Sequence, residues 1–189
     1  HADFKEAISA LHHALAHDSG SGWLHLKLAQ LYERTGRIAL AMDEAKNAVR
    51  LDPQGREGQL YIARLHALNH DFQHAEATLR ALIAQKPDET DAYTSLARVL
   101  HQQNRRAEVA ALFEHMMERN PGYIQGYIEL ARLYLADAEV EKARQYFKKA
   151  LRVDPGHREA LENLALLAEQ EGDWGRAIKY YNRILRYDP

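Results

Sequence analysis

The sequence predicts an all-α fold, an α-solenoid built from antiparallel helix pairs. Its five prolines are spaced 34 residues apart, at Pro53, Pro87, Pro121, Pro155 and Pro189. Between successive prolines, apolar residues recur at helical spacing in two runs that a short break separates. A fixed period of this length is the signature of a repeat array, in which each unit packs on its neighbours and no single central core forms.

The 34-residue frame divides the chain into repeats. Residues 1–21 are expected to be the second helix of a truncated repeat. Complete repeats are expected at 22–55, 56–89, 90–123 and 124–157, and a last one at 158–189 that ends at its proline without a capping helix. In each repeat the proline follows a helical run and helps to end it, because proline has no free N–H.

The residue at the break between the two helices varies along the chain. Gly36 and Gly172 suit a tight turn, because glycine adopts positive φ readily. His70 and Ala138 are less suited to that conformation, so their turns are expected to differ in shape. The aspartates that directly follow the break in two repeats are expected to cap the second helix; they are Asp71 and Asp173.

The fourth repeat carries the clearest version of a known pattern. It has large, leucine, small and tyrosine positions in its first helix, then small, aromatic and small positions before the proline: Tyr127, Leu130, Ala131, Tyr134, Ala143, Phe147, Ala150 and Pro155. The small position of the first helix is alanine throughout, at Ala29, Ala63, Ala97, Ala131 and Ala165. With these residues nearly the whole chain resembles the tetratricopeptide repeat (TPR) family. The departures cluster in the first two complete repeats, at His25, Ala45, Gln59 and His66.

The resemblance implies a right-handed superhelix of helix pairs, whose first helices line a concave groove. Ligand contacts would then come from first-helix positions outside the structural pattern. The candidates are Leu60, Tyr61, Arg64, Thr94, Arg98, Ile128, Glu129 and Arg132. One subset of the family grips the terminal carboxylate of its partner with lysines, asparagines and an arginine. That clamp is absent, because the corresponding residues are Leu26, Gln30, Tyr61, Asp91 and Ser95.

Three of the candidate arginines occupy the same position in successive repeats and are expected to form a ladder along the groove: Arg64, Arg98 and Arg132. A row of guanidinium groups beside apolar side chains suits an acidic, amphipathic segment, since each guanidinium can donate two parallel hydrogen bonds to a carboxylate. The alternative is internal pairing. In that case Asp91 would pair with Arg64, Glu129 with Arg98, and Glu159 or Glu162 with Arg132.

The eleven histidines raise the question of a metal site. His66, His70 and His74 are spaced by four, but the repeat frame places the turn between them, so they are not expected to share a face. His13 and His17 share a helix face, but no third ligand completes them. The sequence therefore predicts no metal and no cofactor. No glycine-rich phosphate loop, nucleophile elbow or cysteine nucleophile is present, so we expect no catalysis.

The charge balance narrows the class of partner. A formal net charge of −2 argues against general nucleic-acid binding, which needs a strong positive field. No apolar run approaches the roughly 20 residues that span a bilayer, so this segment is not expected to insert into a membrane. The favoured function is a non-catalytic scaffold that binds a peptide or a protein in its groove. The alternative is a regulatory or targeting module of a larger enzyme or of a secretion or assembly component. The compartment is not predicted.

The two terminal helices complete the expectations. The first carries Phe4, Ile8, Leu11 and Leu15, and the last carries Ile184, Leu185 and Tyr187. Repeat arrays normally cover such faces with a polar capping helix, because exposed apolar ends self-associate. The sequence shows no cap at either end, so end-to-end self-association is expected.

Overall fold

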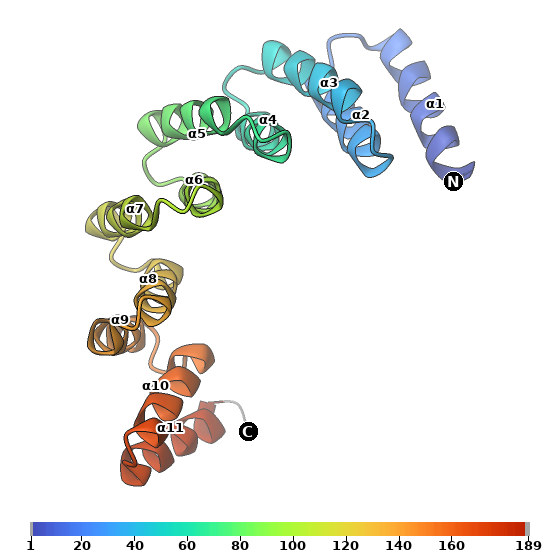
Figure 1. The fold of residues 1–189 in the computed structure, drawn as a ribbon. Coiled ribbons are helices and arrows are strands. Elements are labelled where there is room, and N and C mark those ends of the chain that lie inside the picture. The colour runs from blue at the N-terminus through green and yellow to red at the C-terminus, as the bar shows by residue number, and fades with distance from the viewer. Residues whose placement is uncertain (1, 188–189) are drawn as a thin grey trace. The chain divides into compact units, whose positions relative to one another are not determined.

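A computed structural model describes residues 2–187, all of whose regular elements are α-helices (Figure 1). The chain divides into two compact units, His1–Gln103 and Asn104–Pro189. The first unit contains α1 (Ala2–His17), α2 (Gly22–Arg34), α3 (Ile38–Leu51), α4 (Arg56–Leu68), α5 (Phe72–Gln85) and α6 (Thr90–Gln102). The second contains α7 (Arg106–Arg119), α8 (Ile124–Ala136), α9 (Val140–Val153), α10 (Arg158–Gln170) and α11 (Trp174–Tyr187).

Within each unit, helices that are neighbours in sequence are neighbours in space. In the first unit each helix from α1 to α6 packs on the next, and α4 also contacts α6 directly. In the second unit the same serial packing runs from α7 to α11. This arrangement confirms the predicted all-α solenoid of helix pairs. It follows from the sequence pattern, since each amphipathic helix can bury its apolar stripe only against an adjacent helix.

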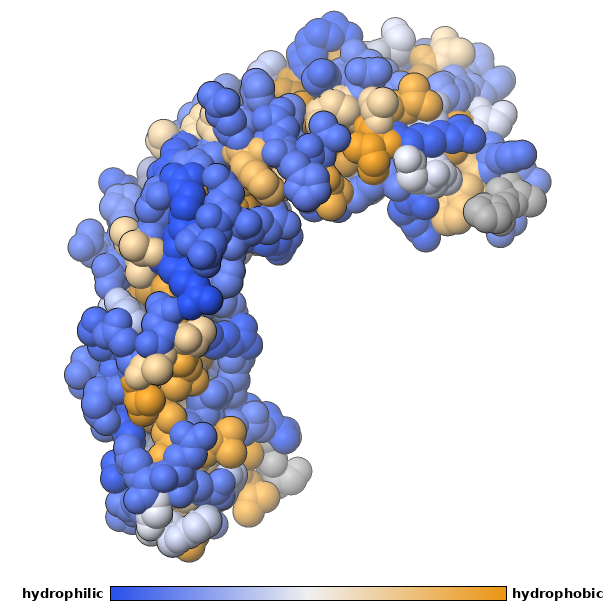
Figure 2. Space-filling view, in the orientation of Figure 1, coloured by the Kyte–Doolittle hydropathy of each residue, from blue (hydrophilic) through white to orange (hydrophobic). Residues whose placement is uncertain are grey.

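The cores of the two units consist of alanines together with larger apolar residues. The core of the first unit includes Leu28, Ala29, Tyr32, Ala41, Ala45 and Leu65, and that of the second includes Ile128, Ala131, Ala143, Phe147, Ala150 and Leu161. The alanine column is fully buried at Ala29, Ala63, Ala131 and Ala165, while Ala97 keeps 7% exposure. A small side chain at these positions is what close helix packing requires, because helix axes 8–10 Å apart leave little room. In Figure 2, hydrophilic side chains cover most of the visible surface, with smaller hydrophobic patches among them.

The turn between paired helices has the same backbone conformation in every repeat. Gly36 (φ 76°), His70 (58°), Asn104 (58°), Ala138 (59°) and Gly172 (75°) all lie in the left-handed region. The expectation that the His70 and Ala138 turns differ in shape is therefore wrong. Repeat packing imposes the conformation, and a residue with a Cβ adopts it at a cost of roughly 1–2 kcal/mol.

The predicted aspartate caps are confirmed. Asp71 Oδ1 accepts a hydrogen bond from the backbone N–H of His74 (3.3 Å), and Asp173 Oδ1 accepts one from Arg176 (2.8 Å). Each cap satisfies one of the free N–H groups at a helix start.

The terminal helices differ from each other in exposure. In α1, Ile8, Leu11 and Leu15 pack against the first core, so the expectation that this apolar face lies open is wrong. In α11, Leu185 is 65% exposed and Tyr187 is 53% exposed, while Ile184 packs inward. Among the described helices, none is both long and apolar enough to cross a membrane.

Candidate interaction surface

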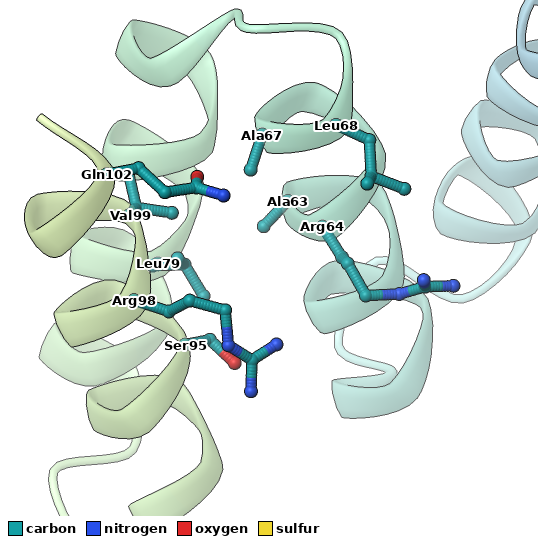
Figure 3. Close-up of a pocket in the computed structure, with 9 residues that line it drawn as sticks. All are labelled: Ala63, Arg64, Ala67, Leu68, Leu79, Ser95, Arg98, Val99 and Gln102. Carbon is teal, nitrogen blue, oxygen red and sulfur yellow. The ribbon is translucent and has the colours of Figure 1, made fainter.

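A pocket of about 170 Å³ lies between the first helices α4 and α6 (Figure 3). Its apolar lining comes from Ala63, Ala67, Leu68, Leu79 and Val99. Its polar lining comes from Arg64, Ser95, Arg98 and Gln102. The helices α4 and α6 contact each other, and the small side chains of Ala63 and Ala67 leave space between them. Two of the three predicted ladder arginines therefore line one pocket.

Arg98 is the cation that this pocket presents to solvent. Its side chain is exposed, and among the described residues of its own unit it makes no hydrogen bond or ion pair. Figure 3 shows it extending from α6 toward α4, with its guanidinium group near Ser95. Leu68, which is 50% exposed, lies on the opposite side of the same pocket. A free guanidinium beside an exposed leucine is a combination that an acidic, amphipathic ligand can use.

Arg64 is already paired, though not with the acid predicted from the sequence. Its Nη1 donates to Glu33 Oε1 at 2.6 Å and its Nη2 donates to Glu33 Oε2, which makes the pair bidentate. Its guanidinium also lies 4.9 Å from the ring centroid of Tyr61. In Figure 3 the Arg64 side chain points away from the pocket. The predicted partner, Asp91, lies instead 3.3 Å from Arg56, so the pairing of Asp91 with Arg64 is wrong.

Glu33 ties α2 to α4 through two residues. Its Oε2 accepts a hydrogen bond from the Tyr61 hydroxyl at 2.9 Å, beside the two from Arg64. Partial burial alone would raise the pKa of Glu33, but the hydrogen bonds from Arg64 and Tyr61 outweigh it and hold the pKa below its usual value. Burial and the Glu33 carboxylate together raise the pKa of the Tyr61 hydroxyl. A recess lined by Gln30, Glu33, Arg34, Tyr61 and Arg64 lies over this group.

The third ladder arginine lies in the second unit and is neutralised there. Arg132 Nε donates to Glu159 Oε1 at 2.7 Å, as the internal alternative predicted, and Nη1 donates to Glu129 Oε1 at 3.2 Å. Glu129 also accepts from Gln125 at 2.7 Å. Glu162, the other proposed partner, pairs with Arg158. Arg132 and Glu129 therefore form an internal charge network.

The remaining predicted site residues are less accessible. Ile128 is fully buried in the second core, so the expectation that it contacts a ligand is wrong. Leu60 and Thr94 are half-buried, and the Thr94 hydroxyl donates to the Asp91 carbonyl oxygen at 3.1 Å. Tyr61 is 7% exposed and lines the recess over Glu33.

Sequence reasoning missed Glu33. The residue precedes Arg64 by 31 positions, slightly less than one repeat, and the second unit has a similar pair in Arg106 and Asp137. Pairs of opposite charge separated by slightly less than 34 residues were the signal that could have identified it.

One expectation about the histidines is also wrong. His66 and His74 lie on either side of the turn in sequence but are close in space, because their rings stack with centroids 5.2 Å apart. Asp71 joins them, and one ligand atom from each of the three residues lies within 4.8 Å of the others. His70 does lie apart, with its ring against Phe72 at 5.8 Å.

Comparison with known proteins identifies the family. Models described as tetratricopeptide repeat match residues 1–65, 60–123 and 128–189. The chain belongs to the tetratricopeptide repeat family. TPR folds are generally non-catalytic modules that bind protein partners, and the chain is a protein-interaction scaffold in that general sense.

A curated relative matches about half of this TPR chain. The "Cellulose synthase operon protein C" of Pseudomonas fluorescens (strain SBW25) is 30% identical over 92 residues. That match spans 49% of this chain and only 7% of the relative's own length.

Solved structures share the fold at low identity. The pilF protein of Pseudomonas aeruginosa is 21% identical with a TM-score of 0.68, and the match covers 100% of this chain and 86% of that one. A MamA structure is 19% identical with a TM-score of 0.64, over 85% of this chain and 94% of that one. YrrB, described as a TPR protein with an unusual peptide-binding site, is 14% identical with a TM-score of 0.57, over 96% and 94%.

Proposed function

We propose that the first unit of this TPR scaffold binds an acidic, amphipathic segment of a partner protein along its first helices α2, α4 and α6, with Arg98 as the anchor. The observation that carries the proposal is the pocket between α4 and α6, where Arg98, which has no ion-pair partner among the described residues of its unit, lies beside the exposed side chain of Leu68. A carboxylate of the partner accepts hydrogen bonds from the guanidinium of Arg98. A neighbouring apolar side chain of the partner contacts Leu68 and Ala67.

The neighbouring charges favour Arg98 over the other two arginines. Arg64 already forms an ion pair with Glu33, and Arg132 already forms ion pairs with Glu159 and Glu129. An incoming carboxylate would have to displace these partners, whereas at Arg98 it breaks no hydrogen bond or ion pair within the described part of the first unit. The predicted ladder of three arginines thus reduces, in this proposal, to one binding residue, while Arg64 and Arg132 are each paired within their own unit. Leu60, Tyr61 and Thr94 then line the approach to it.

The test is a fluorescence-anisotropy titration with a labelled model peptide that alternates leucine and glutamate. A matched peptide with lysine in place of glutamate is the control ligand. We expect the glutamate peptide to bind more tightly, with an affinity that falls as salt rises, because an exposed charge contact is screened. The Arg98→Glu variant should lose this binding and its salt dependence while its thermal stability stays nearly unchanged.

Arg50→Glu is the matched control variant. Arg50 is an exposed arginine on the second helix α3 of the same unit, so the substitution changes the net charge equally but lies off the proposed surface. Arg50→Glu should bind the glutamate peptide as the unmodified chain does. Equal affinity of Arg98→Glu and the unmodified chain would overturn the proposal, and an equal loss in Arg50→Glu would show that only net charge matters.

A second candidate function is a regulatory or targeting module within a larger secretion or assembly component. It is favoured by the curated relative, of which the match spans 7%. Finding these repeats joined to a catalytic or membrane-anchored domain in one polypeptide would support this function. A pull-down of the proteins that bind that polypeptide would test it.

We also propose that the exposed face of α11 mediates self-association. Ile178 is 57% exposed and Leu185 is 65% exposed on this face. The average mass measured by light scattering should rise with protein concentration, and Leu185→Glu should suppress the rise. A constant monomer mass up to millimolar concentration would contradict this prediction.

A further inference from the structure

We propose that His66, Asp71 and His74 form a binding site for a divalent transition-metal ion, with Zn²⁺ as the representative ion, at the turn between α4 and α5. The three residues come from three local positions that the turn brings together. His66 lies in the last turn of α4, Asp71 is the N-cap of α5, and His74 lies in the first turn of α5. The positive φ of His70 reverses the chain between them.

The donor atoms already have nearly the spacing that a metal needs. Asp71 Oδ2 lies 3.0 Å from His66 Nδ1, and Asp71 Oδ1 lies 2.8 Å from His74 Nδ1. Ligand atoms on a tetrahedral zinc, with bonds of about 2.0–2.1 Å, are about 3.3 Å apart. All three ligand atoms lie within 4.8 Å of one another, so they have to close to about 3.3 Å around the ion. Each imidazole that ligates through Nδ1 gives up the proton on that nitrogen, so metal binding releases protons.

The ligand types suit such an ion. Two imidazole nitrogens and one carboxylate oxygen are three of the ligands that zinc binds most often, with a fourth position left for water. An aspartate carboxylate is ionised at neutral pH and so supplies an anionic ligand. The His74 side chain is 69% exposed, which leaves the cluster open on the solvent side for the metal and its water.

The other repeats show why this turn is different. At the positions of Asp71 and His74, the first repeat has Arg37 and Leu40. Three of the other repeats carry pairs of opposite charge there, Arg105 with Glu108, Glu139 with Lys142 and Asp173 with Arg176. Such pairs are ordinary helix-start ion pairs, and the contact between Asp71 and His74 alone would be one more. At the position of His66, however, the other repeats have Tyr32, Leu100, Tyr134 and Ala168, none of which is among the usual zinc ligands. Only the second repeat supplies the third ligand from its first helix.

The site differs from the other histidine pair on the chain. His13 and His17 lie one turn apart on α1, with ring centroids 4.8 Å apart. They have no carboxylate in their cluster among the described residues, so they offer two ligands where the α4–α5 turn offers three. Because a pair on one helix face can bind metal weakly, the test is made in a His13→Ala/His17→Ala background.

The experiment is calorimetric titration of the tag-free chain with ZnCl₂ at neutral pH. We expect one equivalent of Zn²⁺ to bind with micromolar affinity. Asp71→Asn keeps an N-cap of equal quality but removes the carboxylate ligand, and His74→Ala removes an exposed side chain, so neither substitution threatens folding. Each should weaken binding about ten-fold or more, as loss of a metal-supporting group does.

His70→Asn is the matched control, since asparagine also tolerates positive φ and the His70 ring lies outside the cluster. It should retain one equivalent with unchanged affinity. A second readout is the imidazole ¹⁵N spectrum, in which Zn²⁺ should shift the Nδ1 signals of His66 and His74 only. The proposal is overturned if no binding occurs at micromolar metal, or if Asp71→Asn and His74→Ala bind as tightly as His70→Asn.

Discussion

The two units of the molecule repeat one helix hairpin but use matching positions differently. In the first helices, Arg98 of the first unit is exposed and has no partner among the described residues of that unit, whereas Arg132 of the second lies between the carboxylates of Glu129 and Glu159. In the second helices, the aromatic position holds Ala45 in the first unit and Phe147 in the second, and both are fully buried. The repeat therefore determines the backbone. Single side chains determine whether the charged groups on a helix face are paired within the protein or are available to a ligand.

The largest difference in stability between matching positions is expected at Phe147. Phe147→Ala gives the fourth repeat the residue that the first repeat has naturally, but without the neighbours that have adapted to it. We expect the free energy of unfolding to fall by about 3–5 kcal/mol, because a fully buried aromatic ring leaves a cavity. Urea denaturation measures this. A loss below about 1 kcal/mol would show that the second core collapses around alanine as the first one does.

The next effect concerns the alanine column of the first helices. Ala131→Leu and Ala97→Leu should each lower the free energy of unfolding by roughly 1–3 kcal/mol, because the added atoms overpack a close helix contact. Ala131 is fully buried and Ala97 keeps 7% exposure, so the cost should be larger at Ala131. Unchanged unfolding midpoints in urea would show that these alanines do not lie at a close contact.

A smaller difference is expected for charge reversal at the ladder position. Arg132→Glu places a third carboxylate beside Glu129 and Glu159 and removes two exposed ion pairs, so stability should fall by roughly 0–1 kcal/mol. Arg98→Glu breaks no pair within its unit and should change stability less. Thermal unfolding at low salt and at 0.5 M salt measures the difference, which should shrink as salt screens the repulsion. The reverse order of stability would contradict the assignment of Arg98 as the unpaired arginine.

The smallest effect is the pH dependence of stability that Glu33 contributes in the first unit. The pKa of Glu33 in the folded state lies below its ordinary value of 4.5, so the unfolded state binds more protons in acid. The stabilisation is therefore complete above about pH 4.5 and is lost as the pH falls through the lower folded-state pKa. Between pH 6 and pH 3 the urea midpoint should fall further in the unmodified chain than in Glu33→Gln. If the urea midpoints of the two proteins changed in parallel with pH, Glu33 would be excluded as a source of the pH dependence.

The sequence predicted the helices well because the forces that define them are periodic. Apolar spacing, the proline at each repeat end and the aspartate caps act within one repeat, so the hairpins and the alanine column follow from them directly. The turn at Ala138 was mispredicted for the opposite reason. Its local preference disfavours positive φ, and the packing of the hairpin overrides that preference.

The family, the helix pairs and the list of first-helix residues follow from the sequence alone, since all three depend on position within a 34-residue frame. Which of those side chains are available to a ligand depends on how the helices pack. Ile128 is buried, Glu33 reaches Arg64 from the preceding repeat, and His74 folds back onto His66 across the turn. These contacts join residues on different helices, and their geometry depends on how adjacent helices pack, which a periodic pattern does not specify.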